Sequence, residues 1–212
     1  MAHNWSWMEI RVLSISFKII AAYLRERMLT WRMALLLALL VACSYLLDRA
    51  GPTIQVAFRL EIIFFLVLQF RLQDDLNDRE SDRINHPDRV MVRCDGAAPF
   101  LFLILFCIVM ILLLLRLLHY DPMQVNRAYL LGSLMITGWY GLSRLAGLPE
   151  WGRSIGVIAK YPIIVSLVSA RGFDHDLHVY GVLLGVYLLM LVYELAHDPS
   201  QRPAWMRKQG DA

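Results

Sequence analysis

Cysteine is scarce in this chain, and the cysteines present show no paired spacing. Cys43, Cys94 and Cys107 form none of the Cys-x-x-Cys pairs that zinc sites use, and they do not make an even set. A disulfide framework or a structural zinc site needs one of these patterns. The sequence therefore predicts neither.

Charged residues are also few, and the two signs nearly balance. Only 18% of the 212 residues are charged, and the formal net charge is +3. The arginines are spread over several segments, whereas nucleic-acid-binding domains gather them into a basic stripe. We therefore expect no nucleic-acid partner.

Apolar residues, by contrast, are abundant. They make up 58% of the chain, compared with about 45–50% in soluble domains, and the mean hydropathy is +0.50. Six apolar runs are long enough to be candidate transmembrane helices. They cover residues 31–47, 53–71, 98–118, 128–146, 154–170 and 178–195. The sequence thus predicts an all-α fold, a polytopic membrane helix bundle with about six transmembrane helices.

An amphipathic pattern precedes the first run, over residues 5–28. Arg11, Lys18 and Arg25 recur every seven residues on one face, as expected for a helix that lies in the membrane interface. Apolar residues line the other face, namely Ile10, Leu13, Phe17, Ile20 and Leu24. Alternatively, the second half of this segment extends the first span.

The order of these segments predicts a simple organisation. We expect an N-terminal interfacial segment (1–30), a transmembrane domain (31–198) and a cytoplasmic tail (199–212). No cleavable signal peptide is expected, because Trp5, Trp7 and basic residues precede the first long apolar run.

Basic residues predict the orientation of the bundle. With six spans, the N-terminal segment, the loop after the second span and the tail lie on one side, and these segments carry most of the lysines and arginines. The positive-inside rule then puts both termini and that loop in the cytoplasm. The expected location is the inner membrane of a bacterium.

Acidic residues gather where the second apolar run ends. Asp75, Asp78 and Asp82 are three and four residues apart, which predicts one helical face. Clusters of oxygen ligands favour Mg²⁺, which commonly binds substrate phosphates as well. The alternative is a solvated loop whose aspartates pair with nearby arginines such as Arg79, Arg83 and Arg89.

A second acidic pair ends the sixth run. Glu194 and Asp198 are four residues apart, and Pro199 follows them. The count of spans puts this pair on the same side of the membrane as the first cluster. We therefore expect the two clusters to meet over one cytoplasmic cavity.

The first acidic segment resembles a known motif. Asp74-Asp75-Leu76-Asn77-Asp78-Arg79-Glu80-Ser81-Asp82, followed by Arg83-Ile84-Asn85-His86-Pro87-Asp88-Arg89, is similar to the first aspartate-rich motif of the UbiA superfamily of intramembrane prenyltransferases. That motif reads Asn-Asp-x-x-Asp-x-x-x-Asp, then Arg-x-x-x-Pro-x-Arg. Asp74 stands where the family usually has Asn.

The second acidic pair is similar to the second motif of the family, a Tyr followed by Asp-x-x-x-Asp. Tyr193 precedes Glu194, and Glu194 replaces the first Asp of the motif. In another register Asp198 is the first acid, and Arg202 stands where the second is expected.

The fifth run carries basic residues and a Tyr-Pro element. Arg153, Lys160 and Tyr161-Pro162 lie where the family has a tyrosine and basic groups that bind diphosphate. Val165 and Ser166 stand in place of the Lys-Arg pair of the family. The alternative for Lys160 is a lysine that reaches the membrane interface.

The resemblance implies a Mg²⁺-dependent transferase that moves a prenyl group from a prenyl diphosphate to a lipophilic acceptor, aromatic or hydroxyl. The implied magnesium ligands are Asp75, Asp78, Asp82, Glu194 and Asp198. The implied catalytic residues are Asp78, Asp82 and Lys160. The implied substrate-binding residues are Asp74, Arg83, Arg89, Arg153 and Tyr161.

Members of the family usually have more spans than the six expected here. The cavity is then closed by six helices alone, by a second copy of the chain or by a partner subunit. Two other functions stay open, a membrane terpene cyclase of the same family and a non-catalytic membrane subunit.

Two ionisable residues, Arg59 and Glu61, lie within the second apolar run. Ionisable residues inside membrane spans often have a function. We nevertheless expect a structural role, in which both form hydrogen bonds to neighbouring helices.

Overall fold

The computed structural model describes residues 7–48, 54–118 and 121–197, and its regular elements there are all helices. The longer helices are α1 (Trp7–Arg27), α2 (Trp31–Asp48), α3 (Ile54–Asn77), α6 (Ala98–Leu118), α7 (Pro122–Leu145) and α10 (Leu177–His197). The shorter ones are α4 (Arg79–Asn85), α5 (Val90–Arg93), α8 (Glu150–Ile158) and α9 (Lys160–Val168). The predicted all-α class is confirmed.

Four stretches of the described residues are long and apolar enough to cross a membrane. They are Trp31–Asp48, Ala98–Leu118, Trp151–Val168 and Leu177–Leu195. They coincide with the first, third, fifth and sixth predicted runs, which supports a membrane protein. Helices α3 and α7 form at the second and fourth runs, but they are more polar, and their passage through the membrane remains a prediction. So does the interfacial position of α1.

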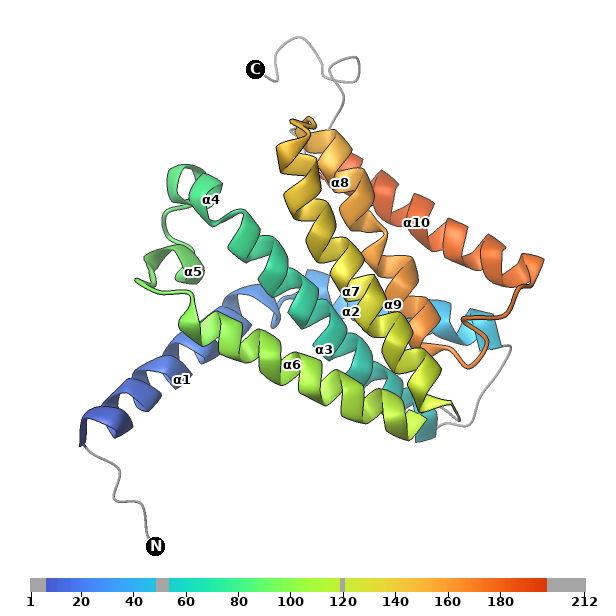
Figure 1. Cartoon of the computed structure of the whole chain (residues 1–212), viewed down its shortest axis with the longest axis horizontal. Helices are drawn as coiled ribbons and strands as arrows, with labels where there is room; N and C mark the ends of the chain where they lie inside the picture. Colours follow the sequence, from blue (N-terminus) through green and yellow to red (C-terminus); the bar gives the residue numbers. More distant parts are fainter. Residues whose placement is uncertain (1–6, 49–53, 119–120, 198–212) are drawn as a thin grey trace, which may run out of the picture.

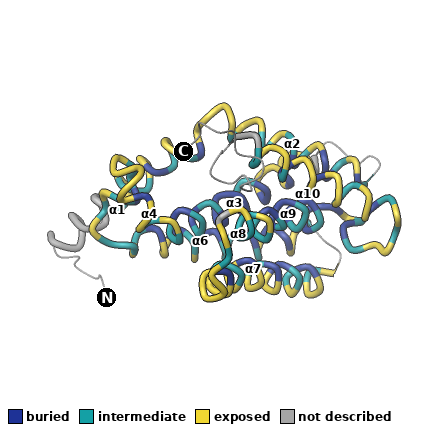
Figure 2. Tube along the Cα trace, turned by 90° about the horizontal axis from the view of Figure 1, so that it is seen from above, coloured by how far each residue is buried: buried dark blue, intermediate teal, exposed yellow. Residues whose placement is uncertain are grey.

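Helices α3 and α9 lie in the middle of the bundle, with α7 on one side and α2 and α10 on the other (Figures 1 and 2). Helix α3 runs beside α6 in the opposite direction (Figure 1). We call the end of the bundle where α3 and α10 finish the site end. The end where α2 finishes and α3 begins is the far end.

A break between α8 and α9 sets the direction of the central helix α9. Pro162 has no backbone N–H, and its ring clashes with the carbonyl four residues earlier in a continuous helix. That carbonyl belongs to Ile158, where α8 ends, and α9 begins at Lys160. Lys160 therefore lies in the first turn of a redirected helix.

A buried ion pair fastens the far end. Arg59 is only 2% exposed and donates to Asp48 at the end of α2. Asp48 also accepts from the Ser169 hydroxyl at 2.6 Å and from the Arg171 backbone N–H at 3.2 Å. These contacts join α2, α3 and the segment after α9, so the structural role predicted for Arg59 is confirmed.

The same prediction was wrong for Glu61. Its side chain is exposed on α3, and it has no hydrogen bond to another described residue. Because Arg59 and Glu61 are only two residues apart, they point to different sides of the helix. One faces the core and the other faces outward.

Replacing Arg59 tests the far-end ion pair. Arg59→Met should lower the free energy of unfolding by on the order of 3 kcal/mol, because it leaves the buried Asp48 carboxylate without its cation. Thermal or denaturant unfolding in detergent measures this loss. Arg171→Met is the matched control, since the Arg171 side chain pairs with Asp174 and Asp176 at the surface. Equal losses in both variants would contradict the assigned role.

Candidate functional site

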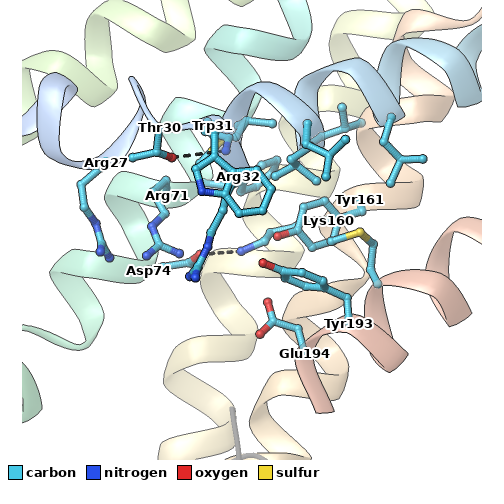
Figure 3. Close-up of a pocket in the computed structure, with 18 of the residues that line it drawn as sticks. Arg27, Thr30, Trp31, Arg32, Arg71, Asp74, Lys160, Tyr161, Tyr193 and Glu194 are labelled. Atoms are coloured by element: carbon cyan, nitrogen blue, oxygen red, sulfur yellow. Dashed lines mark hydrogen bonds and ion pairs between the residues drawn. The ribbon is translucent and has the colours of Figure 1, made fainter. Parts of the chain in front are cut away.

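A cavity of about 790 Å³ opens at the site end among α1, α2, α3, α9 and α10 (Figure 3). One part of its wall is apolar and includes Leu35, Leu36, Leu39, Val67, Phe70, Ile164, Leu189 and Met190. The other part is charged and polar, with Glu26, Arg27, Thr30, Arg32, Arg71, Asp74, Lys160, Tyr161, Tyr193 and Glu194. The cavity can thus accept a molecule that has a charged head and an apolar tail.

An ion pair between α9 and α3 lies at the centre of the charged part. Lys160 Nζ is 2.5 Å from Asp74 Oδ2, and Lys160 is 7% exposed. The other carboxylate oxygen, Asp74 Oδ1, is buried and has no hydrogen-bond partner among the described residues. A buried oxygen of this kind normally has a donor or a cation, and a ligand of the cavity can supply one after a side-chain rotation that turns this oxygen toward the cavity.

Helix α10 adds another acidic residue, Glu194, to the cavity. Glu194 and Tyr193 project toward the same space as Lys160 and Tyr161 (Figure 3). The Lys160 ammonium lies 5.4 Å from the centre of the Tyr161 ring. The structure therefore brings Asp74, Lys160, Tyr161 and Glu194, all named from the sequence, into one cavity.

Three arginines of the cavity were not assigned to the site from the sequence. Arg27, Arg32 and Arg71 line the cavity beside Lys160. Arg71 is three residues before Asp74 on the same helix, and this spacing was a usable signal. No local pattern marks Arg27 or Arg32, which come to the cavity only because α1 and α2 pack over α3.

Asp75 is not part of the cavity wall. It instead joins α1 to α3. It is buried and accepts from Arg27 Nε at 2.8 Å and from the Tyr23 hydroxyl at 2.9 Å. Arg71 Nε lies 3.6 Å from the same carboxylate. In this arrangement protein donors surround Asp75, and the preceding residue, Asp74, lines the cavity.

The prediction that Asp75, Asp78 and Asp82 share one helical face was wrong. Helix α3 ends at Asn77 and α4 begins at Arg79. Between them the Asp78 backbone (φ −92°, ψ 1°) departs from helical values of about −63° and −42°. The bend gives each carboxylate its own surroundings.

The last two aspartates of the motif differ in exposure. Asp82 is buried and pairs with Arg89, as the loop alternative predicted. The Asp78 side chain is 63% exposed, with Arg144 Nη2 at 4.0 Å. No three His, Cys, Asp or Glu side chains of the described residues are grouped closely enough to hold a metal by themselves.

Two further predicted residues, Arg83 and Arg153, lie outside the cavity wall. Arg83 is exposed on α4. The carbonyl oxygen of Arg153 accepts from Trp139 Nε1 at 2.9 Å, and Arg153 is absent from the cavity lining. Asp198 lies outside the described residues.

The cavity offers carboxylates of the kind that bind magnesium together with a phosphorylated ligand. Magnesium is commonly held by one or two carboxylates plus substrate phosphates. Asp74 offers a buried oxygen without a donor, and Glu194 offers a second carboxylate. Such a site needs no third protein carboxylate.

Comparison of this chain with protein-family models, with curated proteins and with solved structures finds no match. The resemblance to the UbiA superfamily therefore remains a prediction from the motifs. The function is argued from the chemistry of the cavity.

Replacing Asp78 tests the electrostatics of the motif. Desolvation by the surrounding protein, and then the like charges of Asp74 and Asp82, raise the pKa of Asp78. A carboxyl whose pKa is higher in the folded state opposes folding once it ionises. This cost grows as the pH rises through the raised pKa, and solvent keeps it small because the side chain is 63% exposed.

Asp78→Asn should therefore raise the midpoint of thermal unfolding at pH 7 without divalent cations, by on the order of 1–3 °C. The difference should shrink as the pH is lowered. Asp174→Asn is the control, because this exposed carboxylate pairs with Arg171 at 2.9 Å and should give no increase. A lower midpoint for Asp78→Asn at pH 7 would contradict the prediction.

Proposed function

We propose that this protein is a Mg²⁺-dependent intramembrane transferase that moves a prenyl group from a prenyl diphosphate to a lipophilic acceptor, an aromatic ring or a hydroxyl. One observation carries the proposal: a single cavity joins a cluster of cations and carboxylates to an apolar wall. A prenyl diphosphate has matching parts, a strongly anionic head and a hydrocarbon tail.

The charged part of the cavity would bind the diphosphate. Arg32, Arg71 and Lys160 donate to its oxygens, and the Tyr161 hydroxyl adds a further donor. Asp74 holds the Lys160 ammonium in position through their ion pair. Fixed donors of this kind stabilise charge that develops on a leaving group.

Asp74 and Glu194 are the residues that would hold magnesium. Bound magnesium supplies positive charge next to the departing diphosphate. Asp78 is exposed and does not line the cavity, but it remains a candidate ligand. Asp75 and Asp82 position α1 and α4 through their pairs with Arg27 and Arg89.

The apolar wall would shelter the prenyl cation. When the allylic C–O bond breaks, its electron pair leaves with the diphosphate, and the allylic carbon becomes electron-deficient. Leu36, Phe70 and Ile164 line the cavity and would keep water from this carbon. A ring carbon or hydroxyl oxygen of the acceptor then bonds to it and loses a proton.

In this proposal six helical segments cross the membrane, including α3 and α7. Helix α3 has 24 residues, a length of about 36 Å, and a bilayer core is about 30 Å thick. Its Arg59 is neutralised by Asp48 inside the protein. The site end faces the cytoplasm of a bacterial cell, and α1 lies in the interface of the inner membrane.

Release of diphosphate tests the proposed reaction. The purified protein should release it from geranyl, farnesyl or geranylgeranyl diphosphate only when magnesium is present. Asp74→Asn and Lys160→Met should each slow release by about 100-fold or more, because each removes a fixed charge from the site. The control Asp174→Asn changes an exposed carboxylate at the far end and should retain the native rate. Thermal unfolding identifies any variant that fails to fold.

The products separate this proposal from the alternatives. Equal rates for the native protein and both cavity variants would overturn the assigned site. A cyclic hydrocarbon formed without an acceptor would replace the transferase with a terpene cyclase. No release from any of the three diphosphates would favour a non-catalytic membrane subunit.

Labelling of introduced cysteines tests the proposed orientation. Ser81→Cys, on exposed α4, should react with a membrane-impermeant maleimide only after the cells are opened. Asp174→Cys, at the far end, should react in cells whose outer membrane alone is permeabilised. Both variants are made in a Cys94→Ser background, because Cys94 is partly exposed, whereas Cys43 and Cys107 are buried. The reverse labelling pattern would show that the site end faces away from the cytoplasm.

A further inference from the structure

Helix α6 presents an exposed apolar seam that takes no part in the cavity. Phe102, Phe106, Val109 and Leu113 are 67%, 45%, 47% and 53% exposed. They are separated by four, three and four residues, the spacing at which one helix packs along another. Arg116, three residues further on, is also exposed and ends the seam.

A carboxylate lies beside this seam in an apolar hollow. Glu61 of α3 is exposed there, and the hollow has a volume of about 520 Å³. The other lining residues are Leu37, Leu60, Phe64, Phe65 and Met110. Within the described parts of the chain, Glu61 has neither a hydrogen bond nor an ion pair. A charge in such surroundings at membrane depth is costly and normally has a partner.

Glu61 and Arg116 approach the same depth from opposite directions. Met110, which lines the hollow with Glu61, is six residues before Arg116, a rise of about 9 Å. Helical side chains lean toward the N-terminus of their own helix. Since α3 and α6 are antiparallel (Figure 1), this lean brings the two charged groups toward a common level.

The two charges lie on opposite flanks of the seam. Met110 marks the flank of α6 that lies nearest Glu61. Because Met110 is six residues before Arg116, the two side chains point about 120° apart around α6. When two parallel helices pack about a two-fold axis, each flank meets the opposite flank of the other helix, as in a parallel coiled coil.

We propose that this face is the interface between two copies of the chain, related by a two-fold axis along the membrane normal. The seams of the two α6 helices pack together, and Glu61 pairs with the partner's Arg116. The symmetry forms this ion pair twice.

Charge complementarity within one surface favours a second copy as the occupant. A two-fold interface must be self-complementary, and this face carries both an outward carboxylate and an outward guanidinium. Lipid tails can cover the apolar seam but cannot neutralise Glu61. The inference rests on the proposed crossing of the membrane by α3 but not on the proposed reaction, because the hollow and the cavity contact different faces of α2. Leu37 lines the hollow, whereas Leu36 and Leu39 line the cavity.

Exchange of the two charges tests the interface. Energy transfer between labelled full-length copies in lipid vesicles should report a dimer for the native protein. Glu61→Arg and Arg116→Glu should each weaken the dimer by about 10-fold or more, because like charges then face each other. Combining both changes should restore it. Glu61→Gln and Arg116→Gln remove the charges without repulsion and should cause smaller losses.

A monomeric native protein, whose seam is covered by lipid alone, would overturn the proposal. So would a double variant no better than the single ones. Crosslinking gives a second measurement: Val109→Cys in the seam should link two copies. Leu134→Cys on α7, which is 68% exposed, should not. Equal crosslinking at both positions would show that the copies meet only by random collision, and it would also overturn the proposal.

Discussion

The ion pair between Lys160 and Asp74 is the contact on which the candidate site depends. Both groups are largely buried, and a buried charge without its partner is strongly destabilising. The pair therefore holds the start of α9 against the end of α3, in the middle of the bundle. The break before α9, caused by Pro162, makes this contact geometrically accessible. The charged part of the cavity forms around it, with arginines from α1, α2 and α3 on one side and α10 on the other (Figure 3).

The buried carboxylates at the two ends of the bundle, Asp48 and Asp74, differ in how far the protein satisfies them. At the far end, Asp48 pairs with Arg59 and also accepts from Ser169 and the Arg171 backbone. Its bonding capacity is used within the protein, as expected for a structural clamp. At the site end, next to an open cavity, Asp74 keeps one buried oxygen without a donor from the described residues. Such an oxygen is a reason to expect a ligand.

The motifs predicted much of the site because they identify residue types and the ends of helices. Asp74, Lys160, Tyr161 and Glu194 were all found in this way. The roles within the first motif were harder to predict, since a bend at Asp78 changes the direction of every later side chain. Asp75 precedes the bend and faces α1, where it pairs with Arg27, whereas Asp82 follows the bend and pairs with Arg89. Periodicity assumes a continuous helix, and this assumption fails at the bend.

The sequence by itself determined the helical class, the apolar segments long enough to cross a membrane and the acidic segments at two helix ends, because these follow from apolar run length and local spacing. Tertiary structure alone decided which charged groups face one another. Arg32 and Arg71 reach the cavity through the packing of α2 over α3, and the outward direction of Glu61 follows from which side of α3 meets the core. Contacts between distant helices depend on how the helices are arranged around one another, and local sequence patterns do not contain that information.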